Sequence, residues 1–237
     1  MRLKLKALLL SAGMGTRLRP LTLKTPKCLI EINGKPILGK WIDELKRVDC
    51  SEVLVNTHYL SDKVISYLNS LKEINIPIKY TYERELLGTA KTIIENKYFF
   101  KDSIGLAIHA DNLTDFDLDK LIQSHKKRTK GTILTMLTFK TDYPERSGIV
   151  EVDRNGVLLN FHEKVINPPG KIANGAIYVF DESFINYLCK MKPTPTDISK
   201  DVIPKLISKV QTCYTEKDLI DIGTIDSLEK ARYIWRK

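Results

Sequence analysis

Short apolar runs alternate with amphipathic segments along the first half of the chain. The runs are rich in β-branched residues, and the segments between them repeat their apolar positions with the period of a helix. We predict strands at 4–10, 52–57, 76–82, 104–109 and 132–139, and helices at 37–47, 62–71, 89–96 and 118–127. This alternation is typical of β-α-β units, which build a mostly parallel sheet with helices on both faces.

The pattern changes after Gly148. Two extended runs, 148–152 and 157–162, flank Asn155-Gly156, and an Asn-Gly pair in this position is a strong hairpin signal. The remaining expected elements are a strand at 175–180, helices at 183–190 and 199–209, a strand at 211–215 and a helix from Ile225. The fold class that follows is α/β, with a Rossmann-like sheet that is mixed but mostly parallel. Without a linker or a repeat, we expect a single domain over 1–237.

Composition and charge narrow the function classes. The hydrophobic fraction of 43% is ordinary for a globular protein, and no apolar run reaches the roughly 18 residues that span a bilayer. Lys4 and Lys6 interrupt the first apolar run, which leads into a glycine-rich loop, so we interpret it as a strand and not as a signal peptide. Four irregularly spaced cysteines without a C-x-x-C pair favour reduced thiols in the cytoplasm.

The net charge of +9 raises the question of nucleic-acid binding. However, the basic residues are scattered, and the one dense run, 126–130, is typical of a solvated helix end. A positive field attracts small phosphorylated ligands equally well. We therefore expect neither a nucleic-acid nor a membrane partner.

The clearest chemical signal follows the first predicted strand, where residues 12–20 read AGMGTRLRP. Gly13 and Gly15 allow the backbone to approach a bulky anion, and Arg17 can bind two phosphate oxygens. Lys27 adds a second cation. The loop matches neither the Walker A pattern nor the three-glycine dinucleotide pattern. Taken alone it is as compatible with a plain strand-to-helix turn as with a phosphate site.

Over a longer stretch the sequence resembles the sugar-1-phosphate nucleotidyltransferases, and in particular the short mannose-1-phosphate and manno-heptose-1-phosphate guanylyltransferases. The matching segments, in order along the chain, are 12–27, GKP at 34–36, LGTA at 87–90, ADN at 110–112, FHEK at 161–164, ANGAIY at 173–178 and DIGT at 221–224. The resemblance implies the nucleotide-diphospho-sugar transferase fold. It also implies a nucleotide-binding half at 1–147 and a sugar-phosphate-binding half at 148–237.

The resemblance implies that Asp111 and Asp221 bind Mg²⁺. Asp111 follows a predicted strand and is therefore expected at the carboxyl end of the sheet, where open α/β sheets bind ligands. In isolation, Asp111 would be interpreted more readily as a turn residue. For Asp221 the alternative is a structural turn before the helix that Thr224 caps. Asp218 is the competing carboxylate for the second position.

The same resemblance assigns the remaining site residues. Those expected to carry catalysis are Arg17, Lys27 and Lys164. Those expected to bind the nucleotide are Ala12, Gly13, Gly15, Thr16, Glu83, Gly88 and Thr89. Those expected to bind the sugar phosphate are Asn112, Glu163, Lys164, Asn174 and Gly175. The chain departs from the family where Val165 replaces a common proline, and where the order Asn174-Gly175-Ala176 leaves open which small residue faces the sugar.

The reaction implied is transfer of a nucleoside monophosphate from an NTP to a sugar 1-phosphate. The expected substrates are GTP and a mannose-type or manno-heptose 1-phosphate, and a homodimer is the expected assembly. Thymidylyl or uridylyl transfer to a glucose-type or amino-sugar 1-phosphate is the alternative. A nucleotide-sugar-dependent glycosyltransferase is a more distant one, because the turn at 111–113 lacks Asp-x-Asp. A non-catalytic nucleotide sensor is a second distant alternative.

Overall fold

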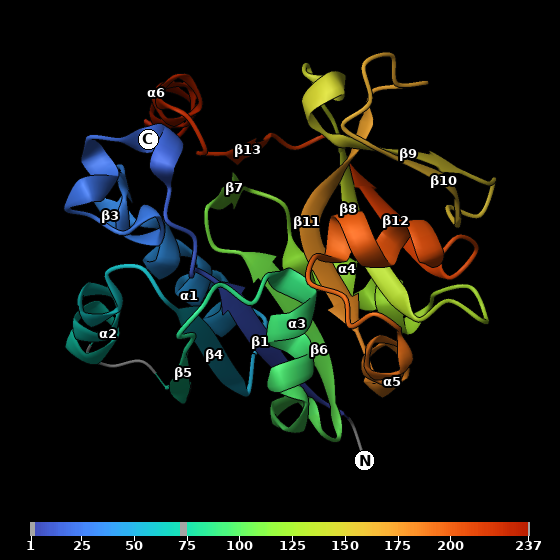
Figure 1. Cartoon of the computed structure of the whole chain (residues 1–237), viewed down its shortest axis with the longest axis horizontal. Helices are drawn as coiled ribbons and strands as arrows, with labels where there is room; N and C mark the ends of the chain where they lie inside the picture. Colours follow the sequence, from blue (N-terminus) through green and yellow to red (C-terminus); the bar gives the residue numbers. More distant parts are fainter. Residues whose placement is uncertain (1–2, 72–74, 237) are drawn as a thin grey trace. The chain divides into compact units, whose positions relative to one another are not determined.

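The computed structural model describes residues 3–71 and 75–236 (Figure 1). The chain forms two compact units that interleave along the sequence. Unit 1 consists of Met1–Leu3, Leu87–Leu106 and Phe116–Asp218, and unit 2 of Lys4–Leu86, Ala107–Asp115 and Leu219–Lys237. The single-domain organisation, with halves at 1–147 and 148–237, stays a prediction.

Unit 2 is built around parallel strands. The strand β1 (Lys4–Leu10) pairs in parallel with β4 (Glu52–Thr57), and β4 pairs in parallel with β5 (Ile78–Tyr82). The strand β6 (Ser103–His109) begins in unit 1, and its last three residues lie next to β1 in unit 2. Loops that follow β1, β4, β5 and β6 therefore leave the sheet at one carboxyl edge, where ligands bind in such folds.

The helices of unit 2 are α1 (Ile37–Arg47), α2 (Ser61–Ser70) and α6 (Ile225–Ile234). In α1 the residues Ile37, Leu38, Trp41, Ile42 and Leu45 are buried, which is the spacing of one apolar helix face. The basic residues at its last turn suit the negative end of the helix dipole. The predicted bounds of this helix are confirmed.

Unit 1 contains a largely antiparallel set of strands. These are β8 (Leu134–Lys140), β9 (Gly148–Val152), β10 (Leu158–Glu163), β11 (Ile172–Phe180) and β12 (Val210–Thr215). The predicted Asn-Gly hairpin is confirmed, because β9 and β10 are antiparallel neighbours. The strand β11 pairs antiparallel with both β8 and β9, whereas β12 runs parallel to β8.

The helices of unit 1 are α3 (Thr89–Glu95), α4 (Leu118–Lys126) and α5 (Glu182–Lys190). Its core includes three aromatic rings, with Phe180 5.0 Å from Phe100 and 5.4 Å from Phe184 between ring centroids. Gly105 lies against this cluster, where a Cβ would meet the ring of Phe180. Strands of both directions, with helices between them, confirm the predicted α/β class with a mixed, mostly parallel sheet of the Rossmann-like type.

Two short strand pairs complete unit 2 and were not predicted. The strand β7 (Asn112–Thr114) pairs antiparallel with β13 (Leu219–Asp221), and β2 (Glu31–Ile32) with β3 (Lys35–Pro36). Strands of two or three residues are too short to show an alternating pattern. The β7–β13 pair matters for the site because it joins the segments that carry the two predicted metal ligands.

The expected helix near residue 200 is wrong. The helix predicted at 199–209 is a single π-helical turn, Ile198–Val202, followed by a 3-10 turn, Ile203–Lys205. Pro204 lies inside the predicted range, and its missing N–H and its ring are incompatible with a continuing α-helix. The basic run at 126–130 is solvated at its lysines, since Lys126, Lys127 and Lys130 are exposed, whereas Arg128 is half-buried and forms an ion pair with Asp181. Within 3–71 and 75–236, each helix falls short of the length or apolarity needed to cross a membrane.

Candidate functional site

The glycine-rich loop of unit 2 is shaped by Gly15. Its φ is +60°, in the left-handed region that favours glycine, and a Cβ there would lie 2.9 Å from Cγ2 of Thr22. The Thr22 hydroxyl donates a hydrogen bond of 2.8 Å to the Gly15 carbonyl. Conformation and packing therefore both require glycine at this position.

The other residues of the loop present backbone to solvent. Ala12 is buried at the end of β1, whereas Gly13, Thr16 and Arg17 are exposed. A Cβ at Gly13 would meet nothing within 4 Å. An open loop of this kind, with small residues and a cation, can bring backbone N–H groups to a phosphate.

Arg17 extends toward Gly223, a residue that was quoted in the sequence motif but not predicted as a site residue. A Cβ at Gly223 would lie 2.8 Å from Nη2 of Arg17 and 3.0 Å from Oδ2 of Asp221. The guanidinium and this carboxylate therefore both lie close to the Gly223 backbone. A larger residue at 223 would collide with one of them.

Lys27, Asp111 and Asp221 form a charged cluster in unit 2. Nζ of Lys27 donates to Oδ1 of Asp221 at 2.8 Å and also to Oδ2 of Asp111. The pairing of β7 with β13 holds the two acids together, since Asp221 is in register with Asn112 and the backbone N–H of Ile222 donates to the Asp111 carbonyl. Three positions that are far apart in the sequence thus meet at the carboxyl edge of the sheet.

Burial and charge oppose each other in this cluster. Burial alone would lower the pKa of Lys27, which is 8% exposed, but the carboxylates of Asp111 and Asp221 outweigh it and raise that pKa above its usual value. Burial would raise the pKa of Asp111, yet Lys27 and then His109 hold it below its usual range. Lys27 and Asp111 therefore carry opposite charges near neutral pH, and the same ammonium also contacts the carboxylate of Asp221.

The two carboxylates provide oxygen ligands of the kind that hard divalent cations prefer. Mg²⁺ prefers oxygen ligands and is commonly bound by one or two carboxylates together with substrate phosphates. Among the described residues, no group of three or more acids, histidines or cysteines could hold a metal. Asp111 and Asp221 are the acids of this cluster that could hold a divalent ion.

A buried polar network lies behind the loop. Asn56 accepts a hydrogen bond from the Ser11 backbone at 2.7 Å, and its amide donates to Oε1 of Glu83 at 2.8 Å. Glu83 is 4% exposed, and its carbonyl is 2.9 Å from Nδ1 of His58. The network fixes the ends of β1, β4 and β5 relative to one another, within the unit that carries most of the predicted nucleotide-binding residues.

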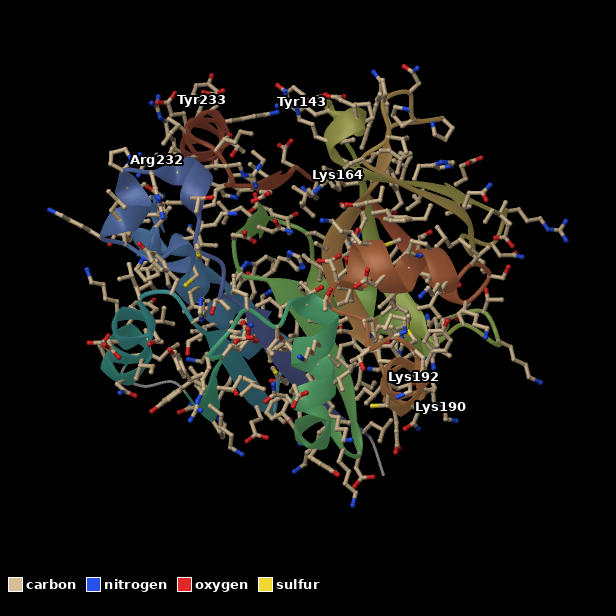
Figure 2. The ribbon with its side chains drawn as sticks, viewed as in Figure 1. Tyr143, Lys164, Lys190, Lys192, Arg232 and Tyr233 are labelled. Atoms are coloured by element: carbon tan, nitrogen blue, oxygen red, sulfur yellow. The ribbon has the colours of Figure 1, made fainter. Side chains whose placement is uncertain are left out.

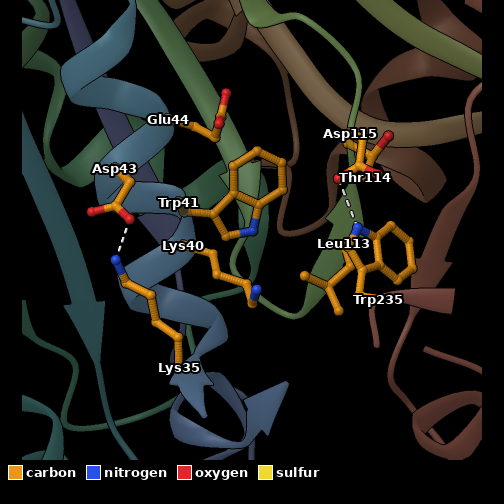
Figure 3. Close-up of a pocket in the computed structure, with 9 residues that line it drawn as sticks. All are labelled: Lys35, Lys40, Trp41, Asp43, Glu44, Leu113, Thr114, Asp115 and Trp235. Atoms are coloured by element: carbon orange, nitrogen blue, oxygen red, sulfur yellow. Dashed lines mark hydrogen bonds and ion pairs between the residues drawn. The ribbon is translucent and has the colours of Figure 1, made fainter. Parts of the chain in front are cut away.

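A pocket of about 230 Å³ lies beside β7 (Figure 3). Its walls include Trp41 and Trp235, whose indole N–H groups donate to the Asn112 carbonyl at 2.8 Å and to Oδ1 of Asp115 at 2.7 Å. These bonds anchor the two ends of the strand that follows Asp111. None of the predicted site residues lines this pocket.

In unit 1 the segment after Gly88 is tied to residues 196–198. Gly88 has a φ of +80°, and a Cβ there would lie 2.5 Å from the Thr196 carbonyl oxygen. The Ala90 N–H donates to the same carbonyl, and the Thr89 hydroxyl oxygen accepts the Ile198 N–H at 2.8 Å. Gly88 and Thr89 are therefore positioned by a segment that none of the sequence motifs includes.

The predicted sugar-binding residues of unit 1 share a hydrogen-bond network. The Ser199 hydroxyl donates to Oε2 of Glu163 at 2.7 Å, and the Asn174 amide donates to the Tyr178 hydroxyl at 2.7 Å and to Ser199 at 3.4 Å. Burial raises the pKa of Tyr178 above its usual value, so its hydroxyl stays neutral. Glu163 and Asn174 are thus brought together through Ser199.

Lys164 lies at the end of β10 (Figure 2). Its φ is +53°, an unusual conformation for a residue with a side chain, and its backbone N–H donates to the Ser147 carbonyl. The side chain is 58% exposed, with Nζ 3.7 Å from Oε1 of Glu163. The left-handed turn therefore presents an accessible ammonium beside the carboxylate.

The Asn174-Gly175-Ala176 segment forms a bulge in β11. The register with β8 shifts between Asn174 and Tyr178, and the Asn174 side chain accepts the Ala176 N–H at 2.8 Å. Ala176 has a φ of +53° and is half-buried, whereas Gly175 is buried. The bulge explains why the asparagine and the small residues occur together.

Several residues of these clusters were not predicted: Gly148, Tyr178, Thr196, Ser199 and Gly223. A Cβ at Gly148 would collide with the ring of Phe161 and lie 2.7 Å from Oε2 of Glu163, so glycine there leaves room for this carboxylate. Tyr178 and Gly223 lie inside the motifs at 173–178 and 221–224, so the sequence does mark these two positions. Ser199 and Thr196 had no local signal, because their partners are far away in the sequence.

Comparison with known proteins shows the family to which the chain belongs. Residues 6–236 match the family described as Nucleotidyl transferase. The chain is 34% identical over 211 residues to the mannose-1-phosphate guanylyltransferase catalytic subunit beta of Drosophila melanogaster, covering 85% of this chain and 54% of that protein. It is 31% identical over 241 residues to the UTP–glucose-1-phosphate uridylyltransferase of Synechocystis sp., covering 93% and 61%. The chain thus spans little more than half the length of these relatives.

Solved structures share the fold. A candidate glucose-1-phosphate thymidylyltransferase from Bacillus anthracis, in complex with a sucrose, has a TM-score of 0.88 at 22% identity and covers 98% of this chain and 96% of its own. HddC from Yersinia pseudotuberculosis, complexed with GMP-PN, has a TM-score of 0.79 at 23% identity and covers 97% and 98%. At this level of identity the likeness concerns the fold.

Proposed function

Because the chain belongs to the nucleotidyl transferase family, we propose that it joins the nucleoside monophosphate of an NTP to a sugar 1-phosphate and releases pyrophosphate. The observation that carries the proposal is the Asp111–Asp221 carboxylate pair, which lies in the same unit as the glycine-rich loop and contacts Lys27. The donor set of this pair suits Mg²⁺ with a polyphosphate. The Glu163–Asn174–Ser199 network of unit 1 supports a polyhydroxylated second substrate.

In the proposed reaction a phosphate oxygen of the sugar 1-phosphate attacks the α-phosphorus of the NTP. The bond between the α-phosphorus and the bridging oxygen breaks, and pyrophosphate leaves with that electron pair. The attacking phosphate is already an anion near neutral pH, so no general base is needed. Mg²⁺, when bound to Asp111 and Asp221, supplies positive charge to the phosphates of the nucleotide.

The protein contributes positioning and charge stabilisation. In unit 2, Arg17, Lys27 and the N–H groups of the loop at 12–16 would bind the triphosphate, and Glu83 would support the nucleotide site. In unit 1, Gly88 and Thr89 would contact the nucleotide. There the Lys164 ammonium would face the attacking phosphate, while Glu163, Asn174 and Gly175 would bind the sugar hydroxyls. Asn112 is proposed separately as a sugar-phosphate-binding residue.

For the substrates we propose GTP and a mannose-type or manno-heptose 1-phosphate. Relatives named as mannose-1-phosphate guanylyltransferases, at 30–34% identity, support this choice. The uridylyltransferase relative supports uridylyl or thymidylyl transfer to a glucose-type or amino-sugar phosphate as the alternative. We further propose a cytoplasmic homodimer without nucleic-acid or membrane partners. The described cysteines, all of them free thiols, are consistent with a reducing compartment.

The test is pyrophosphate release with Mg²⁺, crossing GTP, dTTP, UTP, CTP and ATP against hexose, amino-sugar and heptose 1-phosphates. One productive pair, with GTP and a manno-configured phosphate expected, would establish the reaction and its specificity together. Transfer of sugar from an added GDP-sugar, with no pyrophosphate formed in any combination, would instead favour the glycosyltransferase. Nucleotide binding without pyrophosphate release or sugar transfer in any combination would favour the non-catalytic sensor.

Lys164→Ala tests the unit 1 half of the mechanism. Removal of the exposed ammonium should lower turnover by about 100-fold or more, because a charge aimed at the reacting phosphate is lost. Lys171→Ala, which removes an exposed lysine from the same unit, is the matched control and should stay near wild type. Near-normal turnover of the Lys164 variant would remove this residue from the mechanism.

A further inference from the structure

The ammonium of Lys27 contacts the same carboxylate oxygens, those of Asp111 and Asp221, that would bind the metal. Nζ of Lys27 contacts Oδ2 of Asp111 and lies 2.8 Å from Oδ1 of Asp221. The two carboxylates belong to different segments of the chain. Asp111 is 84 positions after Lys27 in the sequence, and Asp221 is 194 positions after it. A contact that joins three such segments is a specific feature of the tertiary structure and not a consequence of local sequence.

The stem of Lys27 is held in place. The residue is 8% exposed and begins a short 3-10 turn, Lys27–Leu29. A Cβ at Gly15 would lie 3.3 Å from Cβ of Lys27, so the lysine stem packs against the glycine-rich loop. The stem of the Lys27 side chain therefore packs against the proposed phosphate loop, and its ammonium lies at the two carboxylates.

An ammonium and a magnesium ion exclude each other on these oxygens. Mg²⁺ binds oxygen at about 2.1 Å and needs the carboxylate lone pairs that Lys27 uses. Two cations a few ångströms apart also repel strongly in a partly buried site. A divalent ion that binds Asp111 and Asp221 must therefore displace the ammonium to another acceptor.

We propose that Lys27 is a built-in counter-ion of the carboxylate pair, which keeps the free protein's affinity for divalent metal low until a polyphosphate offers the ammonium new acceptors. Metal and nucleotide then bind together, and Lys27 exchanges carboxylate oxygens for phosphate oxygens. This rests on the proposed function for the identity of the metal and the phosphate. It adds that one residue links the two binding events.

The experiment is a titration of the nucleotide-free protein with Mn²⁺, followed by the electron paramagnetic resonance signal of the free ion. Lys27→Met removes the charge and keeps much of the stem, and should bind Mn²⁺ at least about tenfold more tightly than wild type. Lys24→Met removes an exposed lysine three positions earlier and should bind like wild type. Lys27→Arg keeps a cation at this position, so its affinity for Mn²⁺ should stay as low as that of the wild type. Adding Asp221→Asn to Lys27→Met should reverse the gain.

Equal or weaker Mn²⁺ binding by folded Lys27→Met would overturn the proposal. If that variant does not unfold cooperatively, and so is not folded, the melting temperature (Tm) of the wild type provides the test instead. Mn²⁺ alone should then leave Tm within about 1 °C, whereas Mn²⁺ with inorganic tripolyphosphate should raise it by several degrees. An equal shift with Mn²⁺ alone would contradict the counter-ion role. Neither assay uses an NTP or a sugar phosphate. Failure of the proposed reaction would therefore be detected independently, because no pyrophosphate would be released in the pyrophosphate assay.

Discussion

The Ser199 hydroxyl donates a hydrogen bond of 2.7 Å to Oε2 of Glu163. Ser199 also lies within 3.4 Å of the Asn174 amide, so one small side chain touches two of the residues that the family resemblance assigns to the sugar phosphate. The bond fixes which oxygen of the Glu163 carboxylate is available to a ligand. Ser199 is therefore a positioning residue of the proposed sugar site.

Ser199→Ala should raise KM for the sugar 1-phosphate by about tenfold, because a hydrogen bond to a charged group contributes about 1.5–3 kcal/mol. KM for the NTP should change little. Steady-state kinetics with each substrate varied in turn separates the two effects. Ser199→Thr keeps the hydroxyl and should recover most of the loss; an equal defect in both variants would point to packing instead.

Gly15→Ala should destabilise the protein by about 1–2 kcal/mol, because alanine is strained at a φ of +60° and its Cβ would crowd Thr22. Gly13→Ala is the matched control, since a Cβ at Gly13 meets open space, and its stability should stay within about 0.5 kcal/mol of wild type. Urea unfolding of the three proteins measures the difference. Equal midpoints for the two variants would contradict the role given to Gly15.

Stability should fall in acid through His125. Burial, and then Arg128, lowers the pKa of this histidine from 6.5 to about 4, against the opposing charge of Asp181. Because the unfolded chain takes up the proton first, the contribution is fully present above pH 6.5 and is lost as the pH falls from about 6.5 to about 4. Its size is about 3 kcal/mol at most.

The measurement is the urea midpoint from pH 4 to 7.5 for wild type and His125→Gln. The variant should be less stable at neutral pH, since the bond between Nδ1 and the Thr135 hydroxyl is altered, but it should lose less stability in acid. Parallel pH profiles for the two proteins would exclude His125 as the group responsible.

Trp235→Phe should weaken the attachment of α6 to β7. The variant loses the hydrogen bond to Asp115, worth about 1 kcal/mol at a half-exposed site. A double-mutant cycle with Asp115→Ala measures the coupling directly by denaturant unfolding. Additive effects of the two changes would show that the bond contributes nothing to stability.

Much of the fold was predictable because most of its elements are long and patterned. The bounds of the strands 4–10, 52–57 and 148–152 and of the helix 37–47 agree with the structure, since each has clear apolar periodicity and defined ends. The helix predicted at 199–209 is not formed, because Pro204 cannot continue an α-helix despite the helical spacing of the apolar residues there. The family resemblance, carried by motifs, is confirmed by the match over residues 6–236.

The predicted site residues could be chosen from motifs, but their partners could not. The sequence gives no sign that Lys27 contacts both acids, or that Ser199 reaches Glu163, because these contacts depend on how distant segments pack. The positive φ of Lys164 was likewise hidden, since nothing in the sequence marks a lysine for the left-handed region. Roles for the individual site residues stay predictions until the variants are measured.

The three separate stretches that make up unit 2 have a consequence for folding during synthesis. Lys27 leaves the ribosome 194 residues before Asp221, and the last stretch, which includes β13, emerges only after all of unit 1 has been made. Closing such a long loop is entropically costly and slow. We therefore expect unit 1 to fold on the nascent chain, and the charged cluster of unit 2 to assemble as one of the final steps.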